Sequence, residues 1–244
     1  GDTNAQCNLG DLYLKGYGVE QDYKKAKDWF EKAANKGSII GQSVLCALYL
    51  KGYGVEQDYT KGKDWCEKAA NKGDIISQAS LGTIYYKGYG VKKDYTKARY
   101  WYEKSANQEN ANAQYNLGVF YFSGYGLKKD YIKAIYWLEK AAIQGNADAQ
   151  GDLGVFYFNG DGVGQDYARA KYYYEKSANQ GNTNAQYNLG DLYLKGYGVD
   201  KDYKKAKYWF EKAANQEDVS SQIVLAKIYF NGYGVKKNYT KAIY

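Results

Sequence analysis

Residues 185–216 read AQYNLGDLYLKGYGVDKDYKKAKYWFEKAANQ, and this pattern recurs along all 244 residues of the chain. Its central landmark is a Gly-x-Gly motif, which returns every 36 residues without an insertion, as from Gly16 to Gly52 and Gly88. A Glu-Lys-(Ala/Ser)-Ala motif keeps the same interval, starting at Glu31. A fixed interval of this length is typical of repeat proteins, in which each repeat is one supersecondary unit. We expect a single array, 1–244, with repeats at about 1–36, 37–72, 73–108, 109–144, 145–180, 181–216 and, in part, 217–244.

Capping residues predict two helices in each repeat. An Asp, Asn or Ser at the second repeat position, and an Asp or Asn before the second helix, can accept hydrogen bonds from the free N–H groups that open a helix. Gly16 and Gly37 suit the left-handed conformation that ends one. Glu109 and Glu217 replace the second of these glycines in two repeats, so we expect less sharply defined helix ends there. The expected caps are Asp2, Ser38, Asp74, Asn110, Asn146, Asn182 and Asp218 for the first helices, and Asp22, Asp58, Asp94, Asp130, Asp166, Asp202 and Asn238 for the second.

The apolar residues follow helical spacing. The first helix carries Leu9, Leu12 and Tyr13, and the second carries apolar residues from Tyr23 to Ala33, including Phe30. One such hairpin cannot bury its apolar face alone, whereas stacked neighbours can. The sequence therefore predicts an all-α fold, an α/α superhelical solenoid of 36-residue helix-turn-helix repeats.

One pair of substitutions predicts a contact between the two helices of the second repeat. Cys46 stands where most repeats have Gly, and Gly62 stands where the others have Ala. Because a larger group on one helix coincides with a smaller one on the other, we expect Cys46 and Gly62 to touch.

The composition disfavours several classes of function. The chain has no His, which is the commonest general base and metal ligand, and no converging nucleophile and base is visible, so we expect no catalytic residue, metal site or cofactor. Its three Cys have no regular spacing, and we expect no disulfide framework. No signal peptide or membrane span is visible, which leaves the compartment and the oligomeric state open.

The quoted string resembles the Sel-1-like repeat, a relative of the tetratricopeptide repeat. Six copies and a partial seventh share most of its LG, Y, GxGV, DY, KA, W and EKAA landmarks, although the Pro that often follows GxGV in the family is absent. A branch of the family bridges the two helices of each repeat with disulfides, and Cys7, Cys46 and Cys66 do not match that regular pairing. The resemblance implies a superhelix that acts as an adaptor or scaffold in signalling, protein quality control or bacterium–host contacts.

In such superhelices the first helices line the concave groove, so variable polar residues on them are the candidates for binding a protein or peptide. The Asn before the Leu-Gly pair aligns with a groove position that bonds ligand backbone in the tetratricopeptide relatives, and an amide can both donate and accept. The alternative is that these are ordinary exposed helix residues. The candidates are Asn8, Asp11, Tyr115, Asn116, Asp152, Tyr187, Asn188 and Asp191.

Aromatic residues suggest two further interpretations. Tyr86, Phe122, Phe158 and Phe230 could anchor a ligand in the groove, but packing between repeats is favoured. Turn tyrosines such as Tyr17 and Tyr53 could stack on glycans or cell-wall fragments, or could merely cover the adjacent turns.

Nucleic acid is a weaker alternative. Some helical repeat proteins with repeats of similar length bind RNA, with one base recognised by each repeat. The formal net charge of +7 is compatible with such a ligand. The lysines cluster on the second helix and its approach, however, where a solvated outer face accounts for them. The sequence thus favours a protein- or peptide-binding scaffold. Since neither end carries an evident polar cap, we also expect the chain to be a segment of a longer protein.

Overall fold

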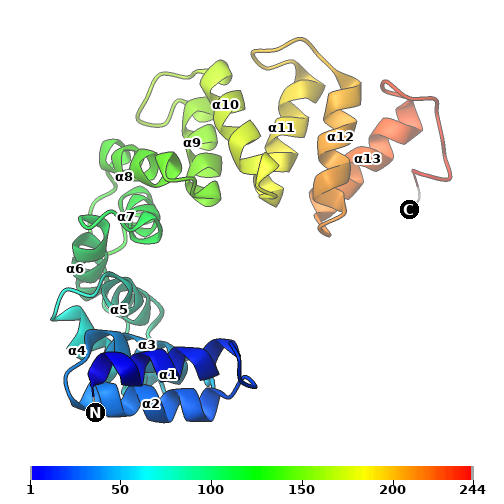
Figure 1. Ribbon diagram of the computed structural model, residues 1–244. Coiled ribbons are helices and arrows are strands. Elements are labelled where there is room, and N and C mark those ends of the chain that lie inside the picture. The colour runs from blue at the N-terminus through cyan, green and yellow to red at the C-terminus, as the bar shows by residue number, and fades with distance from the viewer. Residues whose placement is uncertain (1, 243–244) are drawn as a thin grey trace. The chain divides into compact units, whose positions relative to one another are not determined.

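The computed structural model describes residues 2–242, and within them the chain forms thirteen α-helices and no strand (Figure 1). Odd-numbered helices are the first helices of successive repeats, and even-numbered helices are the second. The helices are α1 (Thr3–Lys15), α2 (Tyr23–Asn35), α3 (Ile39–Lys51), α4 (Tyr59–Ala70), α5 (Ile75–Lys87), α6 (Tyr95–Ala106), α7 (Ala111–Ser123), α8 (Tyr131–Ile143), α9 (Ala147–Asn159), α10 (Tyr167–Asn179), α11 (Thr183–Lys195), α12 (Tyr203–Ala214) and α13 (Val219–Asn231).

The helices fall into two compact units. Unit 1 comprises Gly1–Phe120 with Gly124–Lys128, and unit 2 comprises Tyr121–Ser123 with Lys129–Tyr244. Within each unit the two helices of a repeat pack together, as α3 does with α4, and each second helix packs against the first helix of the next repeat, as α2 does with α3. Contacts between neighbouring repeats therefore build each unit, as the solenoid prediction requires.

The predicted caps are confirmed at every helix. Asp22, for example, accepts a hydrogen bond from the Lys25 backbone N–H at 2.9 Å, and Gly16 ends α1 with φ of +73°. The prediction of blurred ends at Glu109 and Glu217 is wrong. Both residues adopt the left-handed conformation themselves, with φ of +62° and +66°, so the turn has the same form as at the glycines. Asn238 accepts from the Lys241 N–H at 2.9 Å.

The core lies between the helices of each repeat and between neighbouring repeats. Phe30, Ala26 and Ala33 are buried as predicted, but Leu9 and Leu12 are 38% and 39% exposed, which contradicts the expectation for the first repeat. Their equivalents Leu45 and Leu48 are 0% and 2% exposed, because α2 covers that side of α3. Within the described residues no second helix covers the same side of α1.

A close helix crossing explains the first-helix glycines and corrects the cysteine predictions. A Cβ on Gly10 would lie 2.9 Å from the Phe30 ring, so this position must be small when its partner is aromatic. In the second repeat both members change together, to Cys46 and Cys66, and these form a disulfide with a Cα–Cα distance of 5.0 Å. The nearest atoms to a Cβ on Gly62 belong to Leu50. The residues that change together at this crossing are Cys46 and Cys66, and one disulfide forms without a regular cysteine pattern.

Candidate ligand-binding face of the first helices

The predicted site residues lie on four first helices, α1, α7, α9 and α11. On α1, Asn8 is exposed and Asp11 is half-buried, and the Asp11 carboxylate forms an ion pair with Lys15 at 2.7 Å. The same hydrogen bond raises the pKa of Lys15 above its ordinary value. On α7, Tyr115 and Asn116 are half-buried, and the Asn116 amide donates to the Asn112 carbonyl at 2.8 Å. Asn116 is thus partly engaged by its own helix.

In unit 2 two of the candidates influence the same buried tyrosine. The pKa of Tyr174 on α10 is raised by burial and further by the nearby carboxylates of Asp191 and Asp152. These two aspartates lie on α11 and α9, and the negative charge of each disfavours ionisation of the same hydroxyl. Asp191 also pairs with Lys195 at 3.0 Å, and this bond raises the pKa of the lysine. A first-helix face that carries carboxylates from two repeats is well suited to a partner with hydrogen-bond donors or positive charge.

The remaining candidates, Tyr187 and Asn188, differ in their contacts with neighbouring side chains. The Tyr187 ring packs edge-on against Phe210 with centroids 5.5 Å apart, so this side chain supports the fold as well as the face. Asn188 is half-buried on α11 next to it. In α3 and α5 the corresponding positions carry uncharged residues, among them Val44 and Thr83, and the Thr83 hydroxyl shares a 3.0 Å hydrogen bond with Tyr102. The candidates thus do not form one continuous polar strip.

The aromatic residues considered as alternative anchors all contact other rings, and the contacts of Tyr86, Phe122 and Phe158 reach the neighbouring repeat, as the favoured interpretation expected. Tyr86 contacts Tyr95, Phe120 and Tyr125, with centroids 5.4 to 6.0 Å apart. A hydrogen bond with Tyr125, and then burial, raises the pKa of Tyr86 to about 12. The other three members contact rings in the same way: Phe122 with Tyr131 and Phe156, Phe158 with Tyr167 and Tyr197, and Phe230 with Tyr239.

The turn tyrosines join successive repeats. Tyr53 stacks on Tyr23 of the preceding repeat with centroids 5.2 Å apart, and Tyr89 stacks on Tyr59 at 4.8 Å. One face of each of these rings is therefore already occupied, which disfavours the glycan interpretation. The further stacked pairs are Tyr95 with Tyr125, Tyr167 with Tyr197, and Tyr203 with Tyr233.

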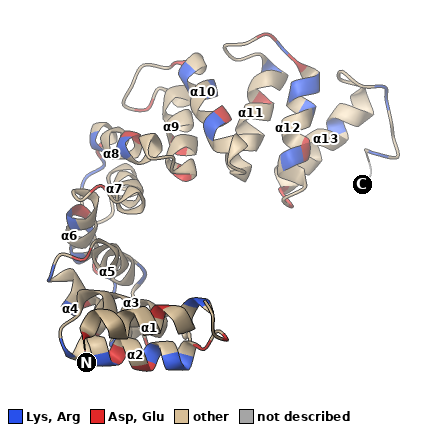
Figure 2. Ribbon diagram, in the orientation of Figure 1, with Lys and Arg blue, Asp and Glu red and all other residues tan. Residues whose placement is uncertain are grey.

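The basic residues lie mainly on the second helices, and Figure 2 shows them on α10 and α12. Many are already engaged: Lys205 lies over the Tyr193 ring at 5.2 Å and Lys207 pairs with Glu211 at 2.8 Å. Residues 2–242 contain no group of three or more His, Cys, Asp or Glu that could hold a metal ion. None of the helices in this range has the length and apolar character needed to cross a bilayer.

Sequence reasoning overlooked a glutamine at the sixth position of each repeat, which is buried in the first six repeats. The Gln78 amide donates at 3.1 Å to the Ala70 carbonyl at the end of the preceding helix, which also accepts from the Gly73 N–H at 3.0 Å. The Gln108 amide in turn donates to Gln78 Oε1 at 2.8 Å. Its recurrence at the same position in all seven repeats was the available signal. The equivalent bonds to preceding helices join Gln42 to Ala34, Gln114 to Ala106, Gln150 to Ala142 and Gln186 to Ala178.

Comparison with solved structures shows close relatives of the whole fold. The crystal structure of c5321, described as a protective antigen of uropathogenic Escherichia coli strains with an SLR fold, superimposes with a TM-score of 0.94 at 37% identity. That match covers 100% of this chain and 52% of the antigen, so the chain spans about half the length of that relative. A Sel1 repeat protein from Oxalobacter formigenes matches with a TM-score of 0.86 at 33% identity, covering 98% of this chain and 94% of the other.

A more distant structure shares the fold alone. The immunity protein Pa5087 from Pseudomonas aeruginosa has a TM-score of 0.53 at 22% identity, and the match covers 87% of this chain and 81% of that one. No protein with a curated functional description matches the chain. The sequence pattern of the Sel1 repeat matches residues 3–38, 40–74, 75–110, 111–146, 147–182, 183–218 and 219–244. With seven matched repeats that extend over nearly the whole chain, the protein belongs to the Sel1 repeat family.

Proposed function

We propose that the chain is a scaffold or adaptor that binds an extended segment of a protein or peptide along its first helices. The observation that carries the proposal is a constant frame with a variable face. Leu and Tyr recur in every first helix, as at Leu189 and Tyr193, and support packing. The positions beside them change from repeat to repeat, as from Asn188 to Asp152, which suits a surface that distinguishes one partner from another.

The packing of first helices supports a recessed face in each unit. Neighbouring first helices contact each other directly, α3 with α5 in unit 1 and α9 with α11 in unit 2, in addition to their contacts with second helices. Elements on the inner side of a curved stack approach each other more closely than those on its outer side. We therefore assign the first helices to the inner side, where an extended segment gains most contact.

The chemistry of the face suits hydrogen bonding to a peptide. The Asn188 amide can donate to a peptide carbonyl and accept from a peptide N–H. The carboxylates of Asp152 and Asp191 can accept from backbone or cationic donors, and charge-assisted bonds of this kind are the stronger ones. With no His in the chain and no converging nucleophile and base on this face, binding is a better account of these residues than catalysis.

Selection of peptides from a random display library tests the proposal without knowledge of the natural partner. Selected peptides should lose at least about tenfold in affinity, or roughly 1.4 kcal/mol, when Asp152→Ala and Asn188→Ala are combined. Tyr187 is left unchanged because its ring packs against Phe210. The matched control is Lys204→Ala on the exposed side of α12, which should bind as the unaltered protein does. Peptides that respond to the control and not to the double variant would refute the proposal.

A further inference from the structure

Isoleucines at the third and fourth repeat positions distinguish the second and third repeats from all the others. The third and fourth positions of these repeats are Ile39 and Ile40 in α3, and Ile75 and Ile76 in α5. Ile40 and Ile76 are 58% and 60% exposed. The other repeats have Thr-Asn, Ala-Asn, Ala-Asp, Thr-Asn and Val-Ser at these positions, so the fold itself does not require isoleucine there. We call these four residues the isoleucine edge.

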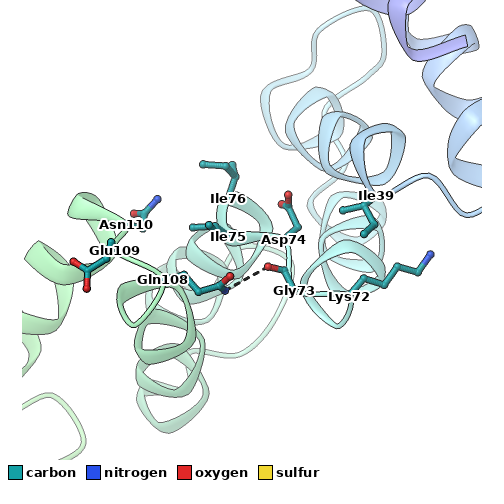
Figure 3. A pocket seen from close by; sticks show the side chains of 9 residues that line it. All are labelled: Ile39, Lys72, Gly73, Asp74, Ile75, Ile76, Gln108, Glu109 and Asn110. Atoms are coloured by element: carbon teal, nitrogen blue, oxygen red, sulfur yellow. Dashed lines mark hydrogen bonds between the residues drawn. The ribbon is translucent and has the colours of Figure 1, made fainter. Parts of the chain in front are cut away.

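A shallow pocket of about 610 Å³ lies along the isoleucine edge, entirely within unit 1. Figure 3 shows Ile39 and Lys72 at one end of it, Ile75 and Ile76 between, and Glu109 with Asn110 at the other end. Lys72 and Glu109 are both exposed. The edge thus carries a positive charge at one end and a negative charge at the other, with the isoleucines and Asp74 between them.

The negative end is held in a costly backbone conformation. Glu109 has φ of +62°, where four other repeats use glycine. A left-handed conformation disfavours residues with a Cβ, and strain of this kind is often found where the side chain has a role. The Glu109 carboxylate accepts from the Gln114 amide of the same repeat at 2.9 Å, and Glu109 lines one end of the pocket. Glycine would satisfy the turn equally well, so the turn alone does not explain a carboxylate here.

We propose that a second copy of this chain docks on the isoleucine edge, forming a two-fold symmetric dimer. In a two-fold interface the same patch meets itself, and residue i of one copy contacts residue j of the other. Rotation of the edge by half a turn sets the Lys72 of each copy against the Glu109 of the other, with the isoleucines packed between. The order of charges on the edge is therefore self-complementary. Because the patch is small, the dimer forms at high protein concentration.

Sedimentation velocity over a concentration series tests the proposal. The average mass should rise from that of one chain, 27.6 kDa, toward twice that value. Combining Ile40→Asn with Ile76→Asn installs residues that the first, fourth and sixth repeats already carry, so the fold should be retained. This variant should weaken association at least about tenfold. Ile143→Asn is the matched control, since Ile143 is an 86% exposed isoleucine in unit 2, and it should leave association unchanged.

Charge reversal tests the two-fold arrangement itself. Lys72→Glu and Glu109→Lys should each weaken association, because each sets like charges together at both ends of the interface. An equal mixture of the two single variants should restore it, since the mixed dimer has opposite charges at both ends. A monomer at every concentration would overturn the proposal, and so would an isoleucine variant that associates normally or a mixture no stronger than its components.

Discussion

Glu109 and Glu217 show how far a residue can depart from local preference when the fold fixes its backbone. Both hold positive φ in turns where glycine is usual, and the sequence alone suggested frayed helix ends instead. The caps were predictable because a cap needs only a local donor and acceptor. The buried glutamines were not predictable, because a glutamine in a helix is normally expected to be exposed, and its contact with the preceding repeat is not visible in the sequence. The Cys46–Cys66 pair was missed for the same reason, since it joins two helices.

Replacing Glu217 by glycine should stabilise the protein. The left-handed conformation costs a non-glycine residue about 1–2 kcal/mol, and glycine removes this cost. Glycine also makes the unfolded chain more flexible, which offsets about 0.5–1 kcal/mol of the gain in folding free energy. We expect Glu217→Gly to gain roughly 0.5 kcal/mol or more, measured by urea unfolding. Glu109→Gly should gain less, since it also removes the bond from Gln114. A lower stability of Glu217→Gly would contradict this account.

The glutamine contacts predict that exchanging Gln and Lys at the last repeat position changes the stability of the protein in opposite directions at Gln180 and Lys72. Gln180 donates to buried Gln150 Oε1 at 2.8 Å, whereas the equivalent Lys72 bonds the Gly37 carbonyl and Gln42 Oε1 is left without a partner. Gln180→Lys should therefore cost about 1–3 kcal/mol, the penalty for a buried acceptor that loses its donor. Lys72→Gln should gain stability. Thermal unfolding at low protein concentration checks both, and effects of the same sign would rule the explanation out.

At the scale of the element, the turn between the two helices sets the spacing of the repeats. The second glycine of each Gly-x-Gly motif has positive φ and, from the second repeat onward, lies against a tyrosine of the preceding repeat. The motif predicted the turn correctly from its conformational needs. Its second purpose, close approach to the neighbouring repeat, was not visible, because a sequence does not show which residue faces a glycine.

Two glycines allow the backbone conformation of the turn to be tested separately from the close approach to the neighbouring repeat. A Cβ at Gly18 would meet nothing within 4 Å, while one at Gly90 would lie 2.9 Å from Tyr59 Cβ, and the two have similar φ of +70° and +63°. Gly18→Ala should cost about 1–2 kcal/mol from backbone strain alone. Gly90→Ala should cost a further ~1–3 kcal/mol because the neighbouring repeat must move. Equal losses in chemical unfolding would show that the turn does not control repeat spacing.

The helix caps predict a loss of stability in acid. The Lys205 backbone N–H, bonded to Asp202, holds the pKa of that carboxyl below its ordinary 3.8, and Asp22 and Asp58 are held down in the same way. A lowered pKa in the folded state means that the stabilisation is present above the unfolded value and is lost as the pH falls through the folded value. Asp202→Asn, which keeps a capping oxygen, should lose less stability between pH 5 and pH 2. An unchanged acid profile would contradict the assignment.

For the molecule as a whole, the sequence predicted the repeat, the helices and the location of the candidate residues on the first helices. All three could be predicted because the same landmarks recur at a fixed interval of 36 residues. It did not predict which candidates act on the same group. Asp152 and Asp191 both act on the pKa of Tyr174 on α10, and that depends on how neighbouring repeats pack. A constant frame that presents a changing face is the central feature of this account.

The most direct test is to locate a bound peptide on unit 2. A peptide selected from the display library would carry a photoreactive group, and the cross-linked residues would be identified by mass spectrometry. The account predicts cross-links to the first helices α9 and α11, near Asp152 and Asn188, at sites blocked by excess unlabelled peptide. Cross-links confined to the second helices α10 and α12, or to the tyrosine turns, would contradict it.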